Sequence, residues 1–242
     1  MFLLPGGQGR PCPPGLQITP LLAVYTLEAA RGITSHPLDP SGLVANQETT
    51  MKFETISELF EYHLGAGAVP LCLRVTGDVR FGEWPASRNN KHHCRVGGLA
   101  EHTFDVLQRV ACMAEAPGPA VDKLVLFTAA VWHDVGKLEE YDCKFEDPPY
   151  GRVIRTCARS DRGKLQSHIM LGLEKWAQLR LVMPAAPMSA LRADHVAHCI
   201  GAHHGRKEWG SPLEPLTLEA MMLHHADMQS VMADVNLNPE SR

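Results

Sequence analysis

Residues 121–137 read VDKLVLFTAAVWHDVGK, and this stretch decides the fold class. From Leu124 to Trp132 almost every side chain is apolar, so no face of a helix formed here would favour water. A helix that is apolar on all sides is typical of the centre of a helical protein, and Gly136 is a residue that would stop it. The stretch therefore predicts a buried central helix that ends in a histidine and an aspartate.

His133 and Asp134 are unusual because they follow directly on this apolar run. An unpaired carboxylate in apolar surroundings is costly to desolvate, so Asp134 requires a cation or strong hydrogen-bond donors nearby. Taken alone, the pair fits an ordinary helix end equally well, with the histidine favoured by the helix dipole and the aspartate at the surface.

Other histidines and aspartates occupy similar apolar settings. His102 lies on the apolar face of one helical pattern, His168 lies among leucine and isoleucine, and Asp227 lies inside a pattern that is apolar nearly all round. Each of them singly is more often a satisfied core residue than a ligand. Several in one small helical domain favour a metal centre, because metals account for buried clusters of histidine and aspartate.

Helical periodicity dominates the chain from residue 98 onward. Helices are predicted over residues 98–116, 121–137, 165–182, 190–204 and 217–235. Residues 139–164 are predicted to be a long irregular loop, and no convincing series of alternating strands is present. The sequence therefore predicts an all-α domain.

The domain limits follow from composition. Residues 1–50 are rich in Gly and Pro and predict a poorly ordered N-terminal extension with one short helix at most. A new helical pattern starts at Met51, so we expect the functional domain to cover residues 51–235 and a tail to cover 236–242.

Overall composition excludes several classes of protein. The net charge of −4 makes the chain as a whole a poor electrostatic trap for nucleic acid or membranes. No run approaches the ~20 apolar residues that cross a bilayer, so no membrane association is expected. Seven cysteines without a C-x-x-C pair indicate reduced thiols and a cytoplasmic protein. These features leave a homo-oligomer open.

The order H…HD…H…HH…D resembles the HD superfamily of metal-dependent phosphohydrolases in its two-metal form. The resemblance covers about residues 80–235 and implies a helical bundle with a dinuclear metal site in its core. It implies that one ion is held by His102, His133, Asp134 and Asp227. It implies that Asp134 bridges to a second ion held by His168, His203 and His204.

Three segments resemble more closely the HD domain of the YhaM-type 3′→5′ exoribonucleases. They are residues 85–103 (PASRNNKHHCRVGGLAEHT), 161–172 (DRGKLQSHIMLG) and 202–227 (AHHGRKEWGSPLEPLTLEAMMLHHAD). The resemblance implies a phosphodiesterase or exonuclease that acts on RNA, single-stranded DNA or short oligonucleotides. Proteins of that type carry an N-terminal OB-fold, and residues 1–50 are too short and too poor in strands to be one.

The implied ligand set suggests a mechanism. A site that is mostly imidazole favours Mn, Fe, Co or Ni, with Zn also suitable, over Mg. Two such ions sharing Asp134 would lie about 3.5–4 Å apart and would activate a bridging water. Lys137 is the candidate cation for the charge that develops on the phosphate. The alternative for Lys137 is a solvated helix end.

Substrate-binding candidates flank these ligands. Arg206 and Lys207 directly follow the paired histidines, His93 is a candidate for the substrate phosphate, and Trp209 could stack a base. A basic stretch is either a phosphate-gripping flap or a solvated loop; it comprises Arg152, Arg155, Arg159, Arg162 and Lys164.

The paired histidines raise a geometric question, because neighbours on a helix point about 100° apart. We expect the helix to end at Gly205, so that a frayed last turn lets His203 and His204 reach one ion. Two alternative activities stay open at this point: a nucleotide phosphohydrolase, and a di-iron oxygenase of the HD type. A non-catalytic nucleotide-binding module is a third reading, although none of the implied ligands is missing.

Overall fold

The computed structural model describes residues 53–89, 91–116, 118, 120–182 and 188–237. The predicted N-terminal extension, residues 1–50, lies outside this part of the chain and stays a prediction. At the other end, α10 (Leu218–Leu237) extends two residues into the predicted tail.

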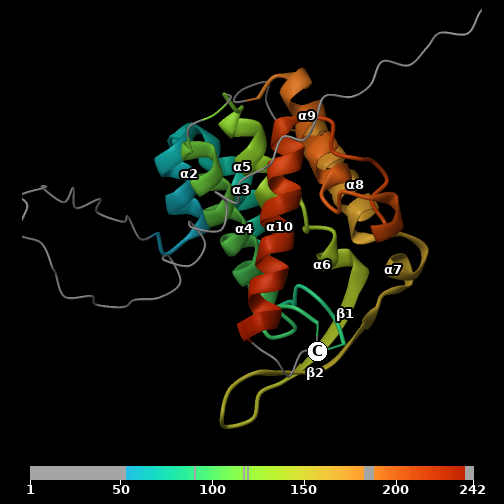
Figure 1. Ribbon diagram of the computed structural model, residues 1–242. Coiled ribbons are helices and arrows are strands. Elements are labelled where there is room, and N and C mark those ends of the chain that lie inside the picture. Colours follow the sequence, from blue (N-terminus) through green and yellow to red (C-terminus); the bar gives the residue numbers. More distant parts are fainter. Residues whose placement is uncertain (1–52, 90, 117, 119, 183–187, 238–242) are drawn as a thin grey trace, which may run out of the picture. The chain divides into compact units, whose positions relative to one another are not determined.

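Helices make up most of the described chain (Figure 1). The α-helices before α10 are α2 (Ile56–Leu64), α3 (Val69–Thr76), α4 (Gly98–Glu115), α5 (Lys123–Trp132), α6 (Lys137–Glu140), α7 (Asp161–Leu165), α8 (His168–Val182) and α9 (Ala190–Ala202). Short 3₁₀ turns are η2 (Ala66–Ala68), η3 (Val79–Gly82) and η4 (Lys207–Trp209). None of the helices in the described part is long and apolar enough to cross a membrane.

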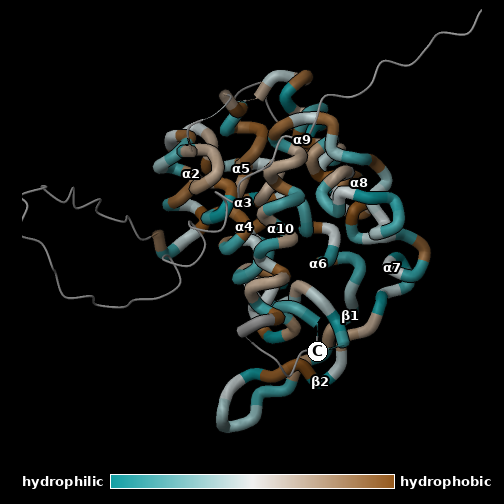
Figure 2. The backbone as a smooth tube through the Cα atoms, viewed as in Figure 1, coloured by the Kyte–Doolittle hydropathy of each residue, from teal (hydrophilic) through white to brown (hydrophobic). Residues whose placement is uncertain are grey.

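α5 is the centre of the bundle. All its side chains from Val125 to Trp132 are buried, and the helix packs against α4, α9 and α10. The hydropathy colouring of Figure 2 is strongly hydrophobic along α5, and Figure 1 shows α10 crossing the bundle beside it. The prediction of a buried central helix is confirmed, and its regular part ends at Trp132, just before the His-Asp pair.

Local hydrogen bonds start several of these helices where the sequence changes from loop to helix. Thr55 and Glu58 form a reciprocal capping box at the start of α2. Asp122 caps α5 by accepting from the backbone N–H of Val125, and Ser189 caps α9 in the same way. These caps fix where the helices of the bundle begin.

The all-α prediction is confirmed for the bundle, but residues 139–164 are not an irregular loop. β1 (Tyr141–Glu146) and β2 (Val153–Arg159) form an antiparallel hairpin that follows α6 directly. The hairpin was missed because its strands are short and mostly exposed, which leaves little alternation of apolar and polar residues.

The expectation of reduced thiols is wrong for two of the cysteines. Cys143 on β1 lies opposite Cys157 on β2, with Cα atoms 4.1 Å apart, and the two are joined by a disulfide. A search for closely spaced cysteines could not find this pair, because only the register of the hairpin places the two residues opposite each other.

Candidate metal centre

The predicted metal ligands come from five segments and converge in the core. They are placed by the face of α4, the end of α5, the start of α8, the turn after α9 and the middle of α10. Their side-chain ligand atoms form two groups, each within 4.8 Å: His102, His133 and Asp227 in one, and His168, His203 and His204 in the other. The structure therefore brings together residues that are up to 125 positions apart in the sequence, from His102 to Asp227.

Asp134 lies between the two groups and faces both. Its Oδ2 is 3.4 Å from Nε2 of His102 and 3.3 Å from Nε2 of His133. Its Oδ1 is 3.5 Å from Nε2 of His168 and 3.8 Å from Nε2 of His203. One carboxylate thus presents a different oxygen to each group of histidines, which is the arrangement of a bridging ligand.

The paired histidines follow α9 instead of ending it. The helix stops at Ala202, two residues before the end of the predicted range 190–204, and the expected stop residue, Gly205, adopts a positive φ of 79°. The rings of His203 and His204 are then 4.4 Å apart between centroids, and both belong to the group that includes His168. His203 keeps an αR backbone, with φ −64° and ψ −25°, so the two side chains come together in a turn that follows the helix and ends at Gly205.

Backbone hydrogen bonds determine which ring nitrogen faces the centre. Each Nδ1 lies near a carbonyl oxygen: His133 at 2.7 Å from Ala130, His203 at 2.7 Å from Ile200, and His204 at 2.9 Å from Trp209. A carbonyl can only accept, so in the neutral ring Nδ1 carries the proton and Nε2 keeps its lone pair. Lone pairs at Nε2 are what a metal ion requires.

Glu140 and Ser230 orient the other two histidines. Nδ1 of His168 is 3.2 Å from Oε2 of Glu140, and Nδ1 of His102 is 3.0 Å from Oγ of Ser230. Glu140 is buried, and sequence reasoning missed it because it fell within the supposed loop. No local pattern could reveal its role, since the contact exists only where α6 packs on α8.

Gly136 allows this packing. Its φ of −64° is ordinary, so the residue is not needed for the left-handed stop that the sequence suggested. A Cβ at this position would lie 1.8 Å from the carbonyl oxygen of His168. Glycine is therefore required for the close approach of α6 to α8, which places Glu140 beside His168.

The electrostatics of the centre favour a bound cation. Oδ1 of Asp134 and Nε2 of His168 and His203 are buried and have no hydrogen-bond partner among the described residues. Burial, reinforced by His204 and His133, holds the pKa of His203 well below its usual range. Burial acts against the charge on Asp134, but Lys137 and His133 outweigh it and keep the pKa of this carboxyl well below its usual value. The neutral imidazole of His203 beside the ionised carboxylate of Asp134 is the state in which these two groups bind metal.

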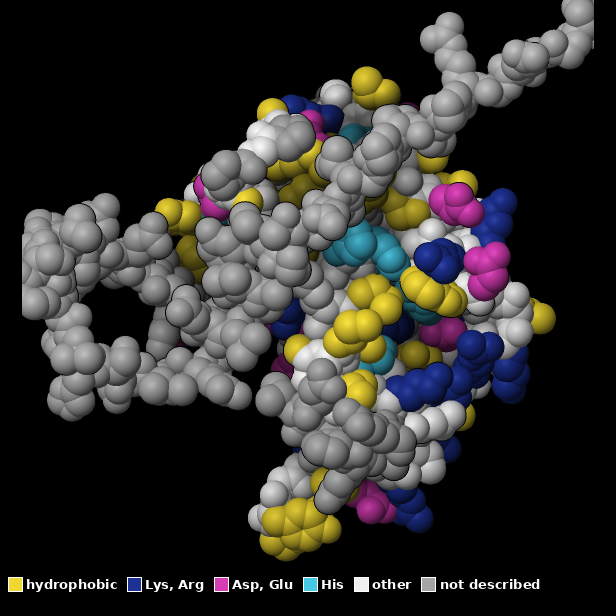
Figure 3. Space-filling view, in the orientation of Figure 1, with side chains coloured by type: hydrophobic (Ala, Val, Ile, Leu, Met, Phe, Trp, Pro, Cys, Tyr) yellow, Lys and Arg dark blue, Asp and Glu magenta, His cyan; other side chains and the backbone are white. Residues whose placement is uncertain are grey.

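A cavity of about 290 Å³ opens onto this centre. Its lining residues are His92, Asp134, Lys137, His204, Trp209, Asp227, Met228 and Val231. Figure 3 shows histidine side chains (cyan) on the visible face of the molecule, with apolar side chains (yellow) beside them. Lys137 is buried at the cavity wall, with Nζ 2.5 Å from Oδ2 of Asp134. The cavity is therefore lined partly by polar side chains, among them three predicted ligands, and partly by apolar side chains.

The predicted substrate-binding residues differ in how they relate to this cavity. The guanidinium of Arg206 lies 5.0 Å from the ring centroid of Trp209, which lines the cavity, and Lys207 is exposed in the adjacent η4 turn. His93 is buried and does not line the cavity, whereas its neighbour His92 does. Sequence reasoning could not separate two adjacent histidines in a turn.

The basic stretch of the hairpin region is occupied by ion pairs. Its partners are Glu83 for Arg152 at 2.9 Å, Glu146 for Arg155, Glu140 for Arg159 at 3.5 Å, Glu174 for Arg162 at 2.5 Å and Asp161 for Lys164 at 2.8 Å. Carboxylates already neutralise these side chains, so the structure favours the solvated alternative over a phosphate-gripping flap.

The family model of the HD domain matches residues 99–232, which is more than half of the chain. The chain belongs to the HD domain family. The matched part of this HD domain runs from α4 into α10 and includes all seven predicted ligands. The predicted HD fold and the assignment to HD phosphohydrolases are confirmed at the level of the family.

Curated relatives support the closer resemblance. The HD domain is similar to the 3′-5′ exoribonuclease YhaM of Bacillus velezensis, with 32% identity over 152 residues, 62% of this chain and 43% of the relative. It is similar to YhaM of Bacillus subtilis, with 30% identity over 153 residues, 62% of this chain and 43% of the relative. For YhaM of Geobacillus sp. (strain WCH70) the identity is 29% over 185 residues, 73% of this chain and 52% of the relative. The chain thus spans about half the length of these relatives or less, and no solved structure matches it significantly.

Proposed function

We propose that this HD domain hydrolyses phosphodiester bonds with two divalent transition-metal ions, as a 3′→5′ exonuclease-like enzyme on RNA, single-stranded DNA or short oligonucleotides. The observation that carries the proposal is Asp134, whose two oxygens face two separate groups of histidines. The similarity to YhaM exoribonucleases supports the choice of a nucleic-acid substrate.

The donor set fits two ions that share one carboxylate. His102, His133, Asp134 and Asp227 would hold the first, and Asp134, His168, His203 and His204 would hold the second. Five imidazoles and two carboxylates suit Mn, Fe, Co, Ni or Zn better than Mg. When bound, such a pair supplies a hydroxide nucleophile and charge stabilisation for the phosphoryl oxygens.

Lys137 is the residue that we assign to the charge of the reacting phosphate. Burial acts against its charge, but Asp134, Tyr141 and Asp227 together outweigh burial and raise the pKa of Lys137, so the ammonium stays charged at neutral pH. It lines the cavity beside Asp134 and can therefore donate a hydrogen bond to a phosphoryl oxygen there.

The apolar side of the cavity fits a nucleobase. Met228 and Val231 follow Asp227 on α10, and Trp209 adds a ring whose residue is about half exposed, at 48%. Aromatic and apolar side chains next to a phosphate-binding centre are typical of sites that stack bases of single strands. Arg206, whose guanidinium lies over the ring of Trp209, would attract the substrate backbone.

The proposal is tested by loading the protein with Mn or with Fe and supplying labelled RNA, labelled DNA, nucleotides and bis-p-nitrophenyl phosphate. We expect hydrolysis of oligonucleotides and of the model diester. Release of phosphate from mononucleotides alone would identify a nucleotide phosphohydrolase instead. Consumption of O₂ by the iron-loaded protein, with no diester cleavage under Mn, would identify a di-iron oxygenase.

Replacing Glu140 with glutamine should weaken the second ion selectively. Glutamine keeps the size of the side chain but removes the charge that orients His168, and loss of such a partner lowers metal affinity about 10- to 100-fold. Calorimetric titration with Mn should show one weakened site and one unchanged site. A matched exposed position, Glu146→Gln on the hairpin, should change neither affinity. Two unchanged sites in E140Q would contradict the assigned role of Glu140.

Binding of the first ion should depend on pH. Burial opposes charge on His102, but Asp134 and Asp227 outweigh it and raise its pKa to about 9. Below that pH an incoming ion must displace the proton of His102, so its affinity should rise about tenfold per pH unit between about pH 6 and about pH 8. Titrations with Mn across this window measure the slope. An affinity that stays constant over the window would refute the prediction.

A further inference from the structure

We propose that His92 is a substrate-binding residue that donates a hydrogen bond to the phosphate bound at the metal centre. The inference rests on the proposed function and names a residue to which neither the family match nor the predicted ligand set gives a role. The evidence for it is the position of His92 in the cavity and the set of hydrogen bonds that fix its loop.

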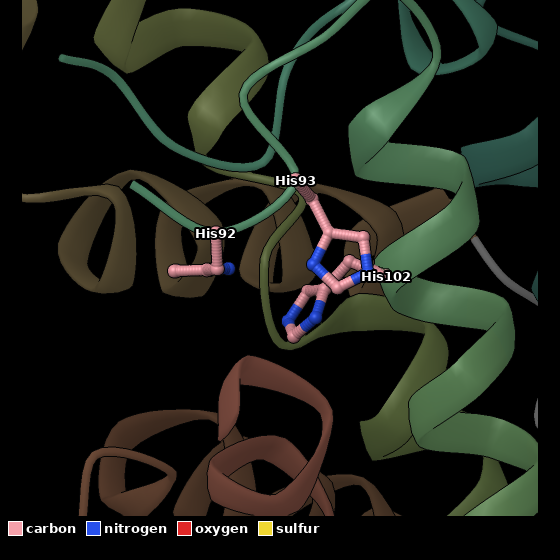
Figure 4. Close-up of side chains that lie close together, drawn as sticks. All are labelled: His92, His93 and His102. Carbon is pink, nitrogen blue, oxygen red and sulfur yellow. The ribbon is translucent and has the colours of Figure 1, made fainter. Parts of the chain in front are cut away.

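His92 reaches the cavity from a loop that contributes none of the predicted ligands. It lines the same cavity as Asp134 and Lys137, and its ring centroid is 5.4 Å from that of His102. Figure 4 shows that the side chains of His92 and His93 leave the loop in different directions and that both lie near His102. The side chain that lines the cavity is therefore His92, while His93 is buried next to it, with the two ring centroids 5.8 Å apart.

Hydrogen bonds from Ser87 and Ala86 and to Asp234 fix the backbone of this loop. The carbonyl of His92 accepts from the hydroxyl of Ser87, and the carbonyl of His93 accepts from the N–H of Ala86 at 3.1 Å. The N–H of His93 donates to Oδ2 of Asp234 on α10 at 2.6 Å, and Arg95 donates to Oδ1 of the same carboxylate at 2.9 Å. These bonds fix the backbone at His92 and His93, and with it the direction in which each side chain leaves the loop.

The loop is also strained at His93. This residue has a φ of 47°, which L-residues other than glycine rarely adopt. A Cβ on Gly98 would lie 2.0 Å from the carbonyl oxygen of His93, so the loop needs glycine at the start of α4 to lie where it does. Strain of this kind persists where the surroundings over-determine the conformation, and it clusters at functional sites.

A third metal ion explains this cluster less well than a phosphate does. The side-chain nitrogens of His92, His93 and His102 lie within 4.8 Å of one another, which makes them a candidate group for a metal. However, Nδ1 of His102 bonds to Ser230, and its Nε2 is 3.1 Å from Oδ1 of Asp227. Two imidazoles then remain, which is fewer ligands than a typical protein site provides.

An imidazole suits a phosphate in this position. It has at least one N–H to donate in either of its protonation states, and hydrogen bonds to charged acceptors are about twice as strong as neutral ones. Lys137 reaches the same cavity from α6, so His92 and Lys137 would contact the phosphate from two different elements.

The test compares two substitutions of His92 in the Mn-loaded full chain. His92→Phe keeps a planar ring without an N–H, and His92→Gln keeps an N–H donor at similar reach. The readouts are the number of bound Mn ions, the Kd for inorganic phosphate by calorimetry, and kcat and KM for bis-p-nitrophenyl phosphate. We expect unchanged Mn content in both variants. The phosphate Kd should be about 10- to 100-fold higher in H92F and within a few-fold of wild type in H92Q.

A histidine elsewhere on the surface provides the control. His225 is exposed on α10, and His225→Gln should leave Mn content, phosphate affinity and turnover as in wild type. If H92F does not fold, as judged by circular dichroism, His92→Ala takes its place, because truncation at a cavity wall creates no overpacking.

The outcomes separate this inference from the proposed function. Equal phosphate affinity in H92F and wild type, loss of a Mn equivalent in H92F, or no phosphate binding by the wild type would each overturn the role of His92. A wild type that binds phosphate through His92 but cleaves no diester would refute the proposed function alone. A wild type that takes up no metal would refute both.

Discussion

Replacing Asp134 with alanine should lower hydrolysis by at least about 10³-fold and reduce the metal content of the protein. Asp134 is the described carboxylate that faces both groups of histidines, so its loss removes a ligand from each proposed ion at once. The measurements are elemental analysis of the purified protein and the rate of diester cleavage under saturating Mn.

Two controls make the result for Asp134 specific. Asp142→Ala on β1 removes an exposed carboxylate near in sequence and should leave both quantities unchanged. Loss of Asp134 also leaves the buried Lys137 without its partner, which costs about 3 kcal/mol or more of folding free energy. Circular dichroism at the assay temperature must therefore confirm that the variant is folded. A folded D134A protein with wild-type activity would end the two-metal proposal.

Replacing His204 with alanine should remove one of two bound metal equivalents and lower turnover by at least about 100-fold. His204 belongs to the group with His168 and His203, and it makes no contribution to the group around His102. It is only partly buried, so its truncation should affect folding less than truncation of the fully buried His203.

The number of metal ions bound per chain tests this prediction. We expect two Mn ions per chain in wild type and one in H204A, measured by titration under anaerobic conditions. His225→Ala, an exposed histidine on α10, should retain two. Two equivalents in H204A would show that the paired histidines are not both ligands.

Much of the site was readable from residue types and their spacing. The all-round apolar pattern of residues 121–137 predicted a buried helix, because apolar burial depends on composition and periodicity alone. The polar residues at its end had to be satisfied in the core, and this requirement pointed to the other histidines. The full set of seven ligands, with His203 and His204, was implied by the resemblance to the HD superfamily, and the structure brings all seven close together.

The hairpin and its disulfide could not be predicted from residue types and their spacing. Its strands are largely exposed, so burial leaves no clear alternation in their sequence. Cys143 and Cys157 are 14 residues apart and meet only through strand register. Glu140 escaped notice for a related reason, since a carboxylate becomes an orienting partner only when another element packs against it.

By itself, the sequence determined which residues had to be buried and which polar groups needed partners, because hydrophobic periodicity and the cost of burying charge are local properties. Tertiary structure alone decided which atoms meet. It turned one oxygen of Asp134 to each group of histidines, anchored Nδ1 so that Nε2 faces the centre, and placed His92 instead of His93 at the cavity. These choices depend on how α4, α8, α9 and α10 pack against their neighbours, and the spacing of residues along the chain does not encode such distances.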